Sequence, residues 1–89
     1  MHTFTEDKVF SDLFKTITIA IKDCQDELGY VDYATCIDHW QQIFIDELME
    51  KYAVWFYDGG NQYEDAMIRI DGYNFDLENV YNEAMKGES

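Results

Sequence analysis

The 89-residue sequence contains no proline, only six basic residues and two cysteines. Without proline the chain has no polyproline segment of the kind that many recognition modules bind. The two cysteines, Cys24 and Cys36, are too few for the disulfide framework of a small secreted domain. The first ten residues carry acids where a signal peptide needs a basic region, so we expect a reduced, cytoplasmic protein.

Long hydrophobic runs are also missing, which argues against a membrane-spanning segment. Apolar residues nevertheless make up 47% of the chain and aromatic residues 17%, which favours a folded protein over a disordered one. A chain of this length forms one domain with a modest core. We therefore expect a single domain over residues 1–89.

The charge is strongly one-sided, with 19 acidic residues against 6 basic ones and a net charge of −13. Such a chain is repelled by nucleic acid and by anionic membranes, so we expect it to bind neither directly. Basic protein surfaces and cations are its natural partners. The alternative is that the acidic surface serves solubility alone.

Two long helices are predicted in the first half. Apolar residues recur at spacings of three and four, which predicts helices over residues 7–28 and 33–51. Thr5 and Asp32 are the expected N-caps, and Gly29 should end the first helix. The predicted apolar stripes are Phe10, Leu13, Phe14, Ile17, Ala20, Ile21, Cys24 and Leu28 in the first helix, and Tyr33, Cys36, Ile37, Trp40, Phe44 and Leu48 in the second.

The second half predicts a β-hairpin and a short helix. Residues 52–57 and 66–70 are rich in strand-forming side chains and are separated by the turn sequence Asp58-Gly59-Gly60-Asn61. A last helix is expected over residues 77–86, with Asp76 as its cap and Gly87 at its end. The predicted fold class is therefore α+β in the order ααββα. Because residues 52–57 and 63–70 also fit a helical spacing, an all-α bundle is the alternative.

No catalytic or metal-binding signature is present. Cys36 and His39 lie one turn apart, but with only Cys24 elsewhere they do not supply the four ligands of a structural zinc site. Residues 71–78 alternate oxygen-bearing side chains without the register of an EF-hand loop, so a turn followed by a capped helix explains them better. We predict no cofactor, no metal and no enzymatic activity, and we interpret both cysteines as buried apolar residues.

The acidic residues are unevenly distributed. Residues 23–50 contain eight carboxylates and no lysine or arginine. Asp23 with Glu27, and Asp46 with Glu50, are like-charge pairs one turn apart, and each pair destabilises a helix by a few tenths of a kcal/mol. A chain tuned only for solubility would not need to gather this repulsion in one zone. The pattern therefore favours a partner-binding surface.

Tyrosines and further acids surround the predicted hairpin turn. Tyr57 and Tyr63 offer rigid amphipathic area of the kind found at interface anchors, although tyrosines that merely cover a core formed by Trp55 and Phe56 are the alternative. The complete set of predicted partner-binding residues is Asp23, Asp26, Glu27, Asp38, Asp46, Glu47, Glu50, Tyr57, Asp58, Tyr63, Glu64 and Asp65.

In size, single-domain organisation, lack of proline and acidity, the chain resembles the phage-encoded inhibitors that imitate DNA, such as anti-restriction and anti-CRISPR proteins. The resemblance implies that it binds a basic nucleic-acid-binding protein in the cytoplasm of a host cell and blocks the DNA or RNA site of that protein. Two alternatives remain open. One is a small non-enzymatic interaction module or adaptor subunit, including a homodimer, and the other is an immunity or antitoxin protein that neutralises a basic toxin.

Overall fold

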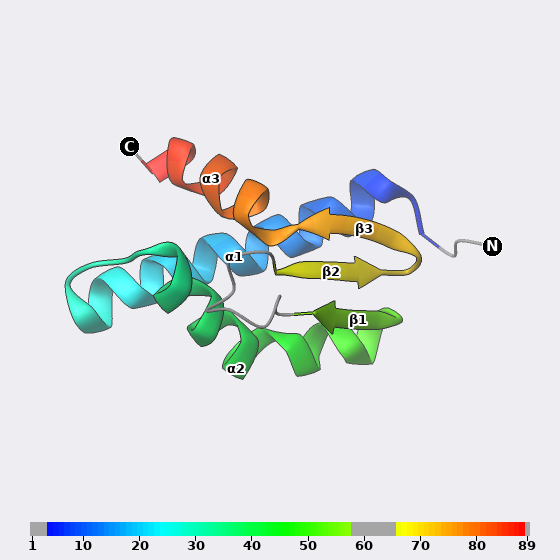
Figure 1. Ribbon diagram of the computed structural model, residues 1–89, viewed down its shortest axis with the longest axis horizontal. Coiled ribbons are helices and arrows are strands. Elements are labelled where there is room, and N and C mark those ends of the chain that lie inside the picture. The colour runs from blue at the N-terminus through cyan, green and yellow to red at the C-terminus, as the bar shows by residue number, and fades with distance from the viewer. Residues whose placement is uncertain (1–3, 58–65, 89) are drawn as a thin grey trace.

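The computed structural model describes residues 4–57 and 66–88 and has an α+β fold (Figure 1). Three helices accompany one antiparallel sheet of three strands, in the order ααβββα. The predicted fold class is confirmed, and the all-α alternative is not what the chain adopts. The elements are α1 (Glu6–Leu28), α2 (Tyr33–Lys51), β1 (Val54–Tyr57), β2 (Met67–Ile70), β3 (Tyr73–Asp76) and α3 (Leu77–Glu88).

The first two helices begin and end where local capping signals place them. The Thr5 hydroxyl accepts a hydrogen bond from the Lys8 backbone N–H at 3.2 Å, and the Asp32 carboxylate accepts one from the Thr35 N–H at 2.8 Å. Gly29 ends α1 in the left-handed conformation, with φ of 79° and its N–H donating to the Gln25 carbonyl. These caps satisfy backbone groups that a helix end otherwise leaves without partners.

The sheet contains one strand more than the sequence pattern predicted. β1 pairs with β2 as expected, but the chain after β2 turns back through Asp71 and Gly72 and adds β3. Both turn residues have positive φ, 53° and 88°, which is the geometry of the tight Asp-Gly turn that joins hairpin strands. Residues 71–76 are therefore a turn and a strand, and the order ααββα is corrected to ααβββα. The helix that follows continues through Gly87 to Glu88, two residues beyond its expected last residue.

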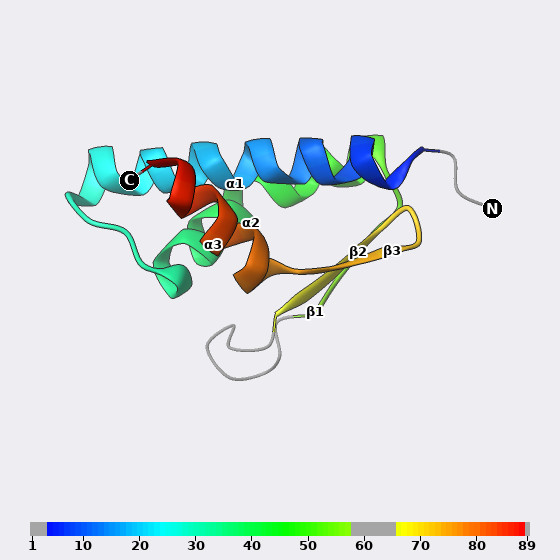
Figure 2. The same cartoon turned by 90° about the horizontal axis from the view of Figure 1, so that it is seen from above.

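The core lies between the helices and the inner face of the sheet. Seen from above (Figure 2), α1 runs along one side of the molecule and the sheet lies on the other, with α3 beside them. Trp40 of α2 is fully buried, its ring centre is 5.9 Å from that of Phe56 in β1, and its Nε1–H donates to the Thr16 hydroxyl at 2.8 Å. Val9 is buried in α1, whereas Phe10 and Leu28 of the predicted stripe are 37% and 53% exposed.

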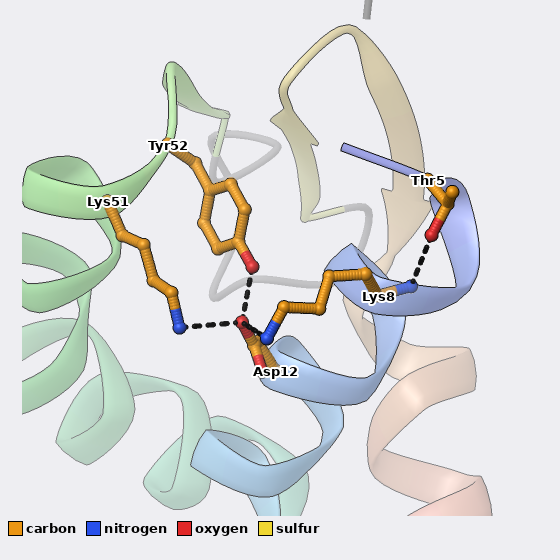
Figure 3. A network of polar contacts seen from close by, with 5 residues as sticks. All are labelled: Thr5, Lys8, Asp12, Lys51 and Tyr52. Carbon is orange, nitrogen blue, oxygen red and sulfur yellow. Dashed lines mark hydrogen bonds and ion pairs between the residues drawn. The ribbon is translucent and has the colours of Figure 1, made fainter. Parts of the chain in front are cut away.

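A carboxylate clasp holds the start of α1 against the end of α2 (Figure 3). Asp12 accepts hydrogen bonds from the Tyr52 hydroxyl and from Lys51 Nζ, the latter at 3.0 Å, and Lys8 Nζ lies 3.5 Å away. Tyr52 leaves α2 at its C-cap and is buried, so the clasp also fixes the direction in which the chain enters β1.

Candidate protein-interaction surfaces

Three of the predicted acids gather where α1 turns into α2. Asp23, Asp26 and Glu27 lie in the last turns of α1, and the carboxylate of Asp23 is 3.5 Å from Nε2 of His39 in α2. Burial raises the pKa of the nearby Cys24 thiol, and the negative charges of Asp23, Glu27 and Asp32 raise it further. These carboxylates therefore concentrate negative charge at the end of the helix pair where α1 leads into α2.

Three more predicted acids lie toward the other end of α2. Asp46, Glu47 and Glu50 are exposed. Asp46 and Glu50 follow His39 by about two and three helical turns, so they lie on the same flank of α2 as His39. Glu47 is turned further toward α1 and lines the groove between the two helices. Along the axis the distance from His39 to Glu50 is about 16 Å, because each helical residue rises about 1.5 Å. The predicted acids therefore form two clusters on one helix pair.

A groove of about 260 Å³ lies between α1 and α2 beside the second cluster. Its lining mixes apolar side chains with both signs of charge, since Lys15 and Lys51 face it together with Asp12 and Glu47. The remaining lining residues are Thr16, Ile19, Phe44 and Leu48. This mixed lining makes the groove less acidic than the corner between α1 and α2.

The basic residues leave most of these acids without ion pairs. All six lysines and arginines lie within the described residues, and their ion pairs there involve only Asp12 and Glu83. Arg69 instead donates from Nε to the side-chain oxygen of Asn74 at 3.0 Å. Over residues 4–57 and 66–88, no ion pair neutralises the group Asp26, Glu27, Asp46, Glu47 and Glu50.

One predicted acid is separated from the others, and four predicted residues lie outside the described chain. Asp38 is exposed on a different flank of α2 from His39, and its carboxylate accepts a hydrogen bond from Gln42 at 3.0 Å. The residues outside the described ranges are Asp58, Tyr63, Glu64 and Asp65.

An exposed aromatic surface includes Trp55, which was not among the predicted partner-binding residues and which the alternative interpretation placed in a core with Phe56. Trp55 and Tyr57 alternate with half-buried Val54 and Phe56, so they project from the opposite face of the sheet, 60% and 49% exposed. Their ring planes are nearly parallel, 4° apart, with centres separated by 6.1 Å. Strand alternation was the signal that could have placed Trp55 beside Tyr57. We define the sheet outer face as Trp55, Tyr57, Met67, Arg69, Asn74 and Asp76.

The cysteines occupy the apolar positions that their pattern predicted. Cys24 and Cys36 are both buried and free, and burial raises the pKa of the Cys36 thiol to about 12. Among the residues that the structure describes, no three histidine, cysteine or carboxylate side chains converge closely enough to hold a metal ion.

None of the helices within the described ranges combines the length and hydrophobicity that crossing a bilayer requires. Comparison with known proteins finds no matching family model, no matching curated protein and no matching solved structure.

Proposed function

We propose that this protein is a non-enzymatic acidic inhibitor that binds a basic nucleic-acid-binding protein and occupies its DNA or RNA site. The observation that carries the proposal is the set of exposed carboxylates on the α1–α2 pair that no lysine or arginine neutralises in the described structure. Exposed and unneutralised, these charges are available to a basic partner. The clustered charge also raises the rate at which such a partner is encountered.

The spacing of these carboxylates fits a surface that imitates a nucleic-acid backbone. Asp23 and Glu27 are one turn apart in α1, as are Asp46 and Glu50 in α2, which separates each pair by about 6 Å along the helix. DNA carries a phosphate about every 3.4 Å per strand along its axis, so each pair matches every second phosphate approximately. Two packed helices lie about 8–10 Å apart, which adds a second row of charge.

The test compares two variants that have the same net charge of −8, because each replaces five carboxylates of a chain with net charge −13 by amides. The site variant carries Asp23→Asn, Glu27→Gln, Asp46→Asn, Glu47→Gln and Glu50→Gln. The control variant carries Glu6→Gln, Asp7→Asn, Asp38→Asn, Glu78→Gln and Glu83→Gln, all exposed and away from the two clusters. Wild type, site variant and control are each immobilised and used to capture proteins from a host lysate, with elution by rising salt.

A captured basic protein is then titrated with labelled duplex or guide nucleic acid in the presence of each form. We expect wild type and control to displace the nucleic acid and the site variant to do so weakly, mainly through slower association. Simultaneous binding of nucleic acid and inhibitor to the partner would refute the blocking function. Equal affinity of the site variant and wild type would refute the assignment of the surface.

A second candidate function is a small interaction module or adaptor subunit. The exposed pair Trp55 and Tyr57 favours it, because large exposed aromatic side chains on a monomer often mark a protein contact. Binding that survives in the site variant but is lost in a Trp55→Ser, Tyr57→Ser variant would support this candidate over the inhibitor.

A further inference from the structure

The sheet outer face differs in charge from the rest of the molecule. The strands β1 and β2, with sequences VWFY and MIRI, contain no carboxylate. The only charged members of the face are Arg69 and Asp76, which balance, on a chain whose net charge is −13. Met67 is 37% exposed and stands opposite Tyr57 in the sheet register, so the apolar surface continues from β1 to β2.

This face points away from the core. Ile68, Ile70 and Phe75 occupy the alternate positions of β2 and β3 and are buried on the inner side, against the helices. A basic partner would find little negative charge here and would meet the guanidinium of Arg69. A second copy of this chain, by contrast, can approach this face with its own sheet. The acidic helix pairs of the two copies then stay apart.

We propose that the sheet outer face is a self-association surface on which a second copy of this chain stacks its own sheet outer face. The inference does not rest on the proposed function, because it involves neither the helix-pair carboxylates nor a basic partner. Two copies related by a twofold axis form an isologous contact, in which the same residues meet from both sides.

The register of the sheet makes the face complementary to itself. Trp55, Arg69 and Asn74 form one row across the three strands, and Tyr57, Met67 and Asp76 form the next. A twofold axis parallel to these rows and between the two sheets exchanges the rows. Trp55 then lies over Tyr57 of the second copy, and Asp76 of the second copy lies over Asn74.

The polar members of the two copies also match in this arrangement. Arg69 already reaches Asn74, to which its Nε donates at 3.0 Å. The guanidinium therefore comes beside the carboxylate of Asp76 from the second copy, and the symmetry repeats this pairing once more. The charges of the face are complementary between copies, and the aromatic rings stack at the β1 edge of the contact.

The size of the apolar patch sets the strength of the association. Aromatic side chains bury about 150–250 Å² each when fully covered, so the exposed parts of Trp55, Tyr57 and Met67 add up to about 300 Å² per copy. Stable complexes bury about 800 Å² per partner, so this contact belongs to the weak class. We expect a dimer that forms in the range from about 10 μM to about 1 mM.

Salt separates this contact from binding through the acidic helices. Two copies with a net charge of −13 repel each other, and ions screen that repulsion over about 10 Å at 0.1 M salt. Self-association should therefore strengthen as salt rises. Binding of a basic partner should weaken over the same range, because the same ions screen its attraction.

The experiment is sedimentation equilibrium across that concentration range, at low and at moderate salt, together with acrylamide quenching of tryptophan. Trp40 is fully buried, so a change in quenching with concentration reports Trp55. The variants are Trp55→Ser with Tyr57→Ser, and Arg69→Glu. Their controls are Met49→Ser, which removes an exposed apolar side chain from α2, and Lys22→Glu, which makes the same charge change on exposed α1 surface.

We expect wild type and both controls to dimerise with falling Trp55 quenching, and both face variants to associate at least about tenfold more weakly. A wild type that stays monomeric throughout the concentration range overturns the proposal. So does a dimer that weakens as salt rises, or one that both face variants form as readily as wild type. None of these results bears on capture of a basic partner by the helix-pair carboxylates.

Discussion

Replacing Asp12 by asparagine tests the clasp between α1 and α2 (Figure 3). The hydrogen bond from Tyr52, together with Lys51 and Lys8, lowers the pKa of Asp12 to about 2 against the opposing effect of burial. Asparagine keeps the shape of the side chain and an oxygen that can accept from the Tyr52 hydroxyl. The substitution therefore removes mainly the negative charge that the two lysines approach.

The magnitude follows from the difference between the folded pKa of about 2 and the reference value of 3.8. One pKa unit corresponds to about 1.4 kcal/mol, so the charged form contributes at most about 2.5 kcal/mol to the free energy of unfolding. The side chain of Asp12 is 15% exposed and both lysines are about half exposed, so solvent screening reduces the contribution. We expect about 1–2 kcal/mol, which lowers the melting temperature by about 5–15 °C in a domain of this size.

The pH dependence has a definite sign. Because the folded pKa lies below the unfolded one, the stabilisation is fully present above about pH 4 to 5 and is lost as pH falls toward 2. Protonation of the many other carboxylates also changes total stability in this range. The informative quantity is therefore the difference between wild type and Asp12→Asn, which should be constant near neutral pH and should fall to a small fraction of that value by pH 2.

Urea unfolding of both proteins, followed by circular dichroism from pH 7 to pH 2, measures this difference. Glu83→Gln is the control, because the Glu83–Lys86 pair is 58% and 74% exposed and should contribute little. Equal stability of wild type and Asp12→Asn at pH 7 would refute the reasoning. A difference that persists unchanged at pH 2 would assign the effect to packing rather than to charge.

Four further substitutions and one treatment with EDTA have defined outcomes. Thr16→Val should lower the free energy of unfolding by about 1–3 kcal/mol, because it leaves the buried Nε1–H of Trp40 without its acceptor; chemical denaturation measures the loss. Gly29→Ala should destabilise by about 1 kcal/mol at its positive φ, whereas Gly87→Ala in α3 should stabilise by up to about 1 kcal/mol, and a melting comparison that gives both the same sign would contradict this. EDTA should leave the melting temperature unchanged, and Cys36→Ala should lower it only through lost packing, so a drop of several degrees with EDTA would reveal a metal.

The helices could be predicted because their ends depend on neighbouring residues. Thr5 and Asp32 cap helices through backbone groups three residues away, and Gly29 ends α1 through its own backbone conformation. Such signals are local, so the observed bounds of α1 and α2 agree with the predicted ones to within a residue.

The third strand was missed although its turn signal was present. Asp71-Gly72 is the preferred sequence of a two-residue hairpin turn, and the alternation of exposed Asn74 with buried Phe75 follows it. The strand has only four residues before α3 begins, and the oxygen-bearing side chains on it resembled a polar turn. Its pairing with β2 supplies the stability that four residues lack alone.

The acidic surface was predictable in composition but not in arrangement. Charge counting identified residues 23–50, yet only the packing of α1 on α2 shows which acids share a side. The contact between Asp23 and His39 shows which flank of α2 lies beside α1. Glu50 lies on that flank, whereas Asp38 lies on another. A helical pattern gives the faces of one helix, whereas the partner of each face depends on tertiary contacts.

The lysines divide the helix pair into a part held together by charge and a part left negative. Lys8 and Lys51 converge on Asp12 where α1 begins and α2 ends, so opposite charges bind the helices there. At the other end the ion pair of Asp23 within the described ranges is with His39, and Asp26 and Glu27 lie at the C-terminus of α1, where the helix dipole disfavours anions by about 0.3–1 kcal/mol each. Moving a single lysine into this end would relieve that repulsion without changing any buried residue. The repulsion therefore has no structural necessity, and a basic partner that compensates it on binding is the explanation that the proposed function supplies.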